Sequence, residues 1–217
     1  MAILKLSIRA LCAAAVPKLK VCVFVLCCFC LVLAACGSSS DSSDTGSTSE
    51  IHFLLASDRG LSEIEGSRRT DLVTFDDNSY VLDPALSPDG KQIAFGRQPP
   101  ATAKPDGSVD FGSDLYIADR DGKNAREIAR HAEIAEFLRD PAWLPDGRIL
   151  FSVYGRTEMS TPDLRLEAID PETGERERLI DNASSPGVAP DGSGFVYNLI
   201  DPVTLDEQLT FVTVDLQ

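Results

Sequence analysis

Two histidines, His52 and His131, are the only imidazole groups of this 217-residue chain, and they limit the reactions it can support. A Ser-His-Asp site or a histidine-based metal centre needs at least one of them beside a suitable partner. They lie far apart in the sequence, at the start of one apolar run and the end of another. Neither has a second histidine at metal-ligand spacing. We therefore expect both to be ordinary polar residues beside a sheet.

Two further motifs that could carry chemistry fail in their details. Gly192-Ser193-Gly194 lacks the spacing of a G-x-S-x-G nucleophile elbow and belongs to a turn. Residues 119–124 (DRDGKN) begin like a calcium loop, but Lys123 and Asn124 replace an oxygen ligand and the glycine, and Arg130 replaces the final glutamate. We interpret 119–124 as a hairpin turn. The sequence predicts no catalytic residue, no metal site and no cofactor.

Three residues are candidates for binding rather than catalysis. Asp83 and Asp140 each precede a proline at the entry to a strand-like run, so both side chains should lie at one rim of the assembled sheets. Such a residue caps the backbone of a turn, or it contributes to an acidic ring that receives a peptide or a cation. Trp143, the single tryptophan, follows Asp140 in the same run. It either packs between sheets or stacks on a ligand.

An eight-residue repeat positions these side chains. It occurs at residues 83–90 (DPALSPDG), 140–147 (DPAWLPDG) and 185–192 (SPGVAPDG), and each copy ends in a Pro-Asp-Gly turn. Proline presets φ at the first central position, and glycine takes the left-handed position that returns the chain to a strand. The turn residues, which we expect to be structural, are Pro88, Asp89, Gly90, Pro145, Asp146, Gly147, Pro190, Asp191 and Gly192.

Each repeat opens a unit that reads as a four-stranded antiparallel meander. In the clearest unit, β-branched and aromatic runs at 148–154, 164–170 and 175–180 follow the first strand. The turns recur after 57 and 45 residues, and the longer spacing contains residues 98–112, which we expect to be a loop. Radial repetition of such meanders gives a β-propeller, whose blades protect one another's edges.

Residues 87–95 (SPDGKQIAF) resemble the core of the TolB-type propeller repeat, and the resemblance covers residues 51–217. It implies an all-β propeller, for which the family normally has six or more blades. Counting units from residue 51 gives about four blades here: a partial unit at 51–75, two complete units and a last unit without a fourth strand. Three explanations stay open. The chain is a truncated ring, or a four-bladed ring completed by 51–56, or an arc that closes with a second copy or another protein.

The first 36 residues resemble a bacterial lipoprotein signal peptide. Basic residues precede a 15-residue apolar run at 21–35, which is short for a membrane span of about 20 residues. The run ends in Leu-Ala-Ala-Cys, similar to a lipobox, so Cys36 is the expected lipidation site. All six cysteines lie at or before Cys36, so the mature chain would have no disulfide. The Ser-, Asp- and Thr-rich residues 37–50 are expected to form a flexible tether.

The strong negative charge excludes some partners. The formal net charge is −14, and removal of the basic signal peptide would bring it to about −18. Such a field repels nucleic acid and anionic lipid head groups.

The resemblances to the TolB-type repeat and to a lipoprotein signal peptide together imply an exported, non-catalytic module that binds a protein or peptide. Its lipid would hold it at the outer membrane, facing the periplasm or the cell surface. The alternatives are the propeller part of a prolyl-oligopeptidase-like peptidase without its hydrolase domain, or a truncated remnant of a longer propeller protein.

Overall fold

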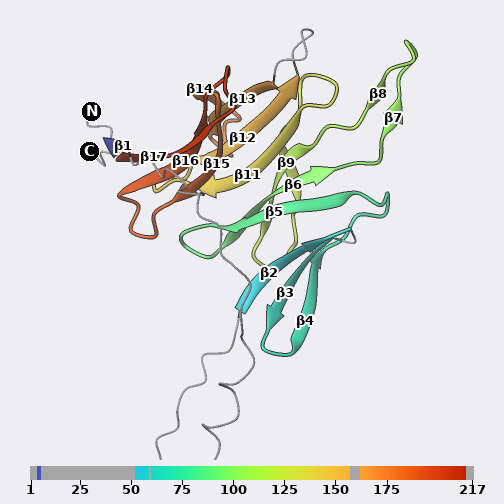
Figure 1. The fold of residues 1–217 in the computed structure, drawn as a ribbon. Helices are drawn as coiled ribbons and strands as arrows, with labels where there is room; N and C mark the ends of the chain where they lie inside the picture. Colours follow the sequence, from blue (N-terminus) through green and yellow to red (C-terminus); the bar gives the residue numbers. More distant parts are fainter. Residues whose placement is uncertain (1–3, 6–51, 59, 157–161, 214–217) are drawn as a thin grey trace, which may run out of the picture. The chain divides into compact units, whose positions relative to one another are not determined.

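The computed structural model describes residues 4–5, 52–58, 60–156 and 162–213. The regular elements in these ranges are all strands, which form four sheets and a short separate hairpin (Figure 1). Nothing in the described ranges is a helix long and apolar enough to cross a membrane. The apolar run at 21–35, Cys36 and the tether at 37–50 lie outside these ranges, and what we expect of them remains a prediction.

The first two sheets are antiparallel meanders. The first has the order β2-β3-β4. Its strands are β2 (His52–Ser57), β3 (Gly60–Glu65) and β4 (Arg68–Val73). The second has four strands in the order β10-β9-β6-β5. Its strands are β5 (Tyr80–Leu86), β6 (Gln92–Gln98), β9 (Asp114–Asp119) and β10 (Arg126–Ala129).

The other two sheets repeat the pattern. The third has the order β11-β12-β13-β14. Its strands are β11 (Phe137–Trp143), β12 (Ile149–Arg156), β13 (Pro162–Ile169) and β14 (Arg176–Asp181). The fourth has the order β15-β16-β17-β1. Its strands are β15 (Ala183–Val188), β16 (Gly194–Ile200), β17 (Glu207–Thr213) and β1 (Leu4–Lys5).

Two details at the ends of the sheet series differ from the expectation. The sequence analysis left the last unit without a fourth strand, whereas β1 pairs there with β17. It also offered 51–56 as the strand that completes this unit. Instead β2 pairs in register with β3, from His52 with Glu65 to Ser57 with Gly60, in a sheet of its own. Pairing β2 with β3 loses less chain entropy than pairing β2 with the last unit, because β2 and β3 are close in sequence.

The expectation of a loop over residues 98–112 was wrong in its centre. Strands β7 (Thr102–Ala103) and β8 (Val109–Asp110) pair there as a hairpin. The out-of-phase Pro-Asp-Gly of this segment makes its turn, in which Gly107 has φ 84° and donates its N–H to the Lys104 carbonyl at 3.0 Å. The same triplet therefore reverses the chain here as it does in the repeats.

The first strands of the three later sheets, β5, β11 and β15, are called the inner strands here. β11 lies against both β5 and β15. Each has a bulge, next to a residue with left-handed φ: Asp83 (49°), Asp140 (53°) and Ser185 (54°). A proline follows each of these residues and removes a ladder donor, so regular pairing cannot continue through the step.

Apolar clusters between successive sheets form the core. Leu61, Phe95 and Tyr116 join the first sheet to the second. Leu115, Leu138 and Phe151 belong to a cluster between the second and third sheets. A third cluster, between the third and fourth sheets, is made by Leu144, Leu150, Leu166, Ala168, Ala183, Phe195 and Tyr197. Each sheet is therefore stabilised by burial against its neighbours, as stacked blades are.

Candidate functional site

A pocket lies where the inner strands end. Its volume is about 480 Å³, and its lining comes from the ends of all three inner strands and from the Pro-Asp-Gly turns that follow them. The lining residues are Ala85, Leu86, Pro88, Pro141, Ala142, Trp143, Pro145, Val188, Ala189, Pro190, Asp191 and Gly192. Most of these side chains are apolar, and Asp191 supplies the one carboxylate. An apolar hollow with few polar groups is typical of a ligand site.

Trp143 connects the pocket to the core. Only 7% of the residue is exposed, and it belongs to the cluster between the second and third sheets. Its Nε1–H donates to the Ala85 carbonyl on β5 at 3.1 Å, which satisfies the polar end of the ring. Trp143 therefore holds two inner strands together, and it also contributes to the pocket lining.

The Pro-Asp-Gly turns that frame the pocket are held by side-chain caps. In the first, Ser87 Oγ donates to Asp89 Oδ1 at 2.8 Å, and the Lys91 backbone N–H donates to the same oxygen at 3.1 Å. The hydrogen bond from Ser87, with those from Lys91, lowers the pKa of Asp89 to about 2. The aspartates of the other two turns, Asp146 and Asp191, accept backbone N–H groups in the same way. The side-chain oxygens of these aspartates thus fix the turns, as Asx-turns do.

Farther along the inner strands, Asp83 forms a bridge to the next sheet. Its Oδ2 accepts a hydrogen bond from Arg139 Nε at 2.5 Å and one from the Asp140 backbone N–H at 3.3 Å. The hydrogen bond to Asp83 raises the pKa of Arg139 above its usual range. Asp83 thus binds the backbone of a neighbouring strand rather than that of its own turn, and whether the two aspartates also receive a peptide or a cation remains a prediction.

The Asp140 carboxylate makes its hydrogen bond within the third sheet. Its Oδ2 accepts a hydrogen bond from the Tyr154 hydroxyl at 2.9 Å. Burial, together with the nearby Asp140 carboxylate, raises the pKa of Tyr154, so the phenol stays protonated and donates. The Ser185 backbone N–H in turn donates to Ser152 Oγ at 2.9 Å. Asp83 therefore ties the second sheet to the third, and the bond between Ser185 and Ser152 ties the third sheet to the fourth.

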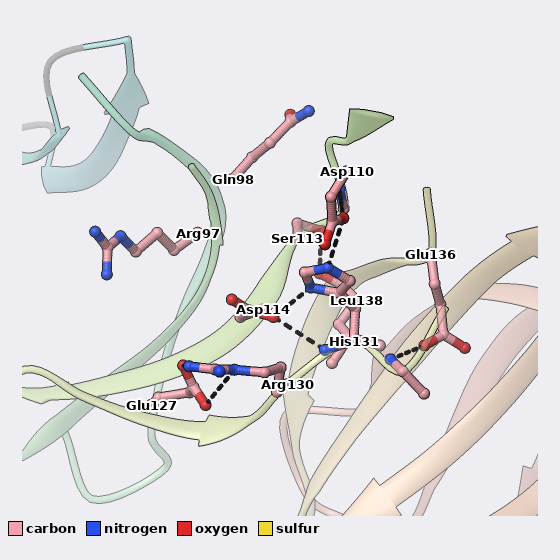
Figure 2. A network of polar contacts seen from close by, with 12 residues as sticks. Arg97, Gln98, Asp110, Ser113, Asp114, Glu127, Arg130, His131, Glu136 and Leu138 are labelled. Atoms are coloured by element: carbon pink, nitrogen blue, oxygen red, sulfur yellow. Dashed lines mark hydrogen bonds and ion pairs between the residues drawn. The ribbon is translucent and has the colours of Figure 1, made fainter. Parts of the chain in front are cut away.

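A buried network around His131 was not anticipated from the sequence. His131 lies just after β10, between two carboxylates (Figure 2). Its Nδ1 lies 2.6 Å from Asp114 Oδ1, and its Nε2 lies 2.9 Å from Asp110 Oδ1. Burial lowers the pKa of His131, but the hydrogen bonds with Asp114 and Asp110 outweigh burial and raise it. The raised pKa favours the imidazolium form, whose two N–H groups can donate to both carboxylates and so fasten the β7–β8 insertion to β9.

The same network continues to Arg165 on the third sheet. Its guanidinium contacts Glu136, with Nη2 2.8 Å from Oε1, and Glu167, with Nε 2.6 Å from Oε1, and it also contacts Asp163. Glu136 further accepts the Ala132 backbone N–H at 2.6 Å, a contact drawn in Figure 2. Within the described part of the chain, no group of three or more His, Cys, Asp or Glu side chains could hold a metal ion. These charges are satisfied by one another and by backbone, so the network fastens the connector between β10 and β11 to the third sheet.

Comparison with known proteins identifies the architecture. No protein-family model matches the chain, and no curated protein matches it. Among solved structures, TolB from Acinetobacter baumannii superposes with a TM-score of 0.52 at 16% identity, over 76% of this chain and 39% of that chain. The chain has the fold of a TolB-like β-propeller. The all-β blades predicted from the Pro-Asp-Gly repeats are thereby confirmed.

The propeller fold alone does not decide the activity. A puromycin-hydrolyzing peptidase from Mycobacterium tuberculosis superposes with a TM-score of 0.51 at 16% identity, over 76% of this chain and 29% of that chain. The chain thus spans less than two fifths of the length of either neighbour. Propeller blades of this kind occur both in TolB and in a peptidase, so function has to be argued from the site itself.

Proposed function

We propose that this propeller is a non-catalytic binding module that takes a peptide or a protein segment at the pocket beside the Pro-Asp-Gly turns. The observation that carries the proposal is the pocket of about 480 Å³ built from three blades at once. The caps of its turns and the interlocked inner strands hold the pocket walls before any ligand arrives. A pre-formed site loses less entropy on binding than a flexible one.

The lining indicates the chemistry of the ligand. Leu86 is 43% exposed, so an apolar side chain can be covered there. Prolines at 88, 145 and 190 give flat surfaces of low entropy, which suit an extended, apolar or proline-containing segment. The Asp191 carboxylate, whose pKa is lowered by hydrogen bonds from Ser193, favours a basic residue next to that segment. The negative net charge of the chain also favours a positively charged partner.

The proposal includes attachment to a membrane. Lipid on Cys36 would hold the propeller at the outer membrane, facing the periplasm or the cell surface, through the tether at 37–50. A tether of this composition has a root-mean-square reach of roughly 20 Å. The blades would then be presented to partners near the membrane without diffusing away.

Selection from a displayed library of random peptides, about twelve residues long, on the purified full-length chain tests the proposal. We expect enrichment of apolar or proline-containing peptides that carry a basic residue and bind saturably. Prolonged incubation should return these peptides uncleaved by mass spectrometry. Failure to enrich any common sequence contradicts the binding function. Cleaved peptides would instead support the peptidase-related alternative.

A further inference from the structure

We propose a second binding surface: the edge of β2 opposite β3, along residues 52–56, takes one antiparallel strand donated by a partner protein. This inference goes beyond the proposed function, because no residue of β2 lines the pocket. It rests on the place of β2 in its blade, on the sequence of β2 and on what fills the same place in the other blades.

Strand β2 has the place of a second strand, not of an inner strand. The inner strand of each later blade lies against the second strand of the preceding blade, since β11 contacts β6 and β15 contacts β12. β5 contacts β2 in the same way. In the second and third blades the second strand pairs with an inner strand on one side and a third strand on the other. β2 pairs with β3, and no other described strand pairs with it. Among the described residues, the inner position of the first blade is therefore unfilled.

The sequence of β2 lacks the features that protect other edges from pairing. The outer edge strands β4, β10 and β14 each begin with arginine and also carry acidic residues. The inner edge strands have bulges and prolines, which are Pro84, Pro141 and Pro186. β2 (HFLLAS) has no proline, no Asp, Glu, Lys or Arg and no bulge in its register. A regular, uncharged edge of this kind readily pairs with another strand.

One face of β2 packs against the core, and the other face is partly exposed, so an added strand could cover it. Leu54 and Ala56 pack against the core cluster of the first two blades. Phe53 and Leu55 point to the other face and are 47% and 37% exposed. A strand paired with β2 would place its side chains beside these two and cover them, as cross-strand neighbours do.

The filled positions in this chain define the occupant. The three inner strands are six or seven residues long, and each is the last strand of its sheet. The inner position therefore holds a single strand rather than the edge of a second sheet. Each inner strand also contains a left-handed residue followed by proline and then by alanine or glycine. The geometry points to an extended partner segment with this X-Pro-small step and with apolar residues on the face beside Phe53.

A labelled synthetic peptide with the sequence of residues 137–147 (FLRDPAWLPDG) is a suitable probe, because it reproduces one inner strand. We expect saturable binding to the full-length chain in fluorescence anisotropy. The double substitution Phe53→Lys, Leu55→Lys should weaken binding at least about tenfold, since edge charges oppose strand addition. The matched control is Leu209→Lys on β17, where the leucine is 45% exposed, and it should leave the affinity within about twofold.

A backbone-altered probe makes the test independent of whether the variants fold. N-methylation of the peptide nitrogens that face β2 removes ladder donors but keeps the side chains, and it should abolish binding. Equal binding of the methylated peptide overturns the inference, as does no saturation up to about 1 mM. Loss of binding in Leu86→Asp but not in the β2 double variant would place the peptide in the pocket instead. A concentration-dependent dimer that the β2 double variant dissociates would assign the edge to a second copy, which also contradicts the proposal.

Discussion

Substitution of Arg165 by methionine should destabilise the propeller strongly, because this one guanidinium neutralises several buried carboxylates. The Arg165 side chain is 12% exposed, and its partners Glu136 and Glu167 are 3% and 9% exposed. In the variant Glu167 keeps its bond from Arg176 Nη2 at 2.7 Å. Glu136 keeps only the Ala132 backbone N–H among the hydrogen bonds described above. A buried charge left without its partner costs about 3–5 kcal/mol.

Urea unfolding followed by circular dichroism measures this loss. With a slope of about 2 kcal/mol/M, the unfolding midpoint of Arg165→Met should fall by roughly 1.5–2.5 M. The matched control is Arg130→Met, which removes an arginine that is 72% exposed and paired with Glu127. It should cost about 0–1 kcal/mol, because exposed ion pairs contribute little. Equal midpoints for the two variants would refute the view that Arg165 stabilises the fold by neutralising buried carboxylates.

The effect of Arg165→Met should also depend on pH. Burial raises the pKa of Glu136, but the Ala132 N–H and Arg165 outweigh burial and lower it below the usual 4.5. A lowered pKa stabilises the fold above pH 4.5, and this contribution is lost as the pH falls through the folded-state pKa. The difference in unfolding free energy between wild type and Arg165→Met should therefore shrink below about pH 4.5. A difference that does not change with pH would contradict this role of Glu136.

Three further predictions address other parts of the chain. Gly122→Ala should cost clearly more than Gly107→Ala in urea unfolding, by about 1–3 kcal/mol. Both glycines have φ near +80°. An added Cβ at Gly122 would lie 2.0 Å from the Leu72 carbonyl oxygen, whereas nothing lies within 4 Å of one at Gly107. Equal losses of unfolding free energy would contradict the packing described. Because the pKa of His131 is raised above 6.5, its contribution to stability is complete below pH 6.5 and lost as the pH rises through the folded-state pKa. The unfolding free energy of wild type should fall in that window and that of His131→Gln should not, which pH-dependent urea titrations can check. Cys36→Ser should abolish incorporation of labelled fatty acid in a bacterial host and leave the chain outside the membrane fraction; a labelled variant would rule out the lipobox.

Local chemistry made much of the fold predictable. The Pro-Asp-Gly turns, with Gly90, Gly147 and Gly192 all at positive φ, fall where the repeats indicated. The short runs after these turns have a period of two residues, which indicates strands. Because short turns make consecutive strands neighbours, the runs also indicate the order of the strands in each sheet. The β7–β8 hairpin was missed because the expectation for 98–112 relied on the phase of the repeat, whereas the turn residues act locally.

The site depended on contacts that a sequence read locally does not contain. His131 finds Asp110 and Asp114 17 or more residues away, and Arg165 finds Glu136 29 residues away. Acidic residues often precede a basic residue at intervals like these, so sequence spacing alone did not identify the ion pairs of His131 and Arg165. A hint did exist: Arg165 lies in the middle of a strand-like run with Asp163 and Glu167 two residues to either side, and a charge on a packed strand is expensive to bury without partners. The role of Asp83 likewise became visible only when β5 and β11 were placed side by side.

The most direct test of the central claim is the affinity of a library-selected peptide for two matched variants of the full-length chain. Leu86→Asp puts a charge into the pocket at a leucine that is 43% exposed, and Val109→Asp makes a similar change on β8 at a valine that is 46% exposed. Anisotropy titration should give a loss of at least about tenfold for Leu86→Asp and less than about twofold for Val109→Asp. Equal affinities for both variants and wild type would contradict binding at the pocket beside the turns.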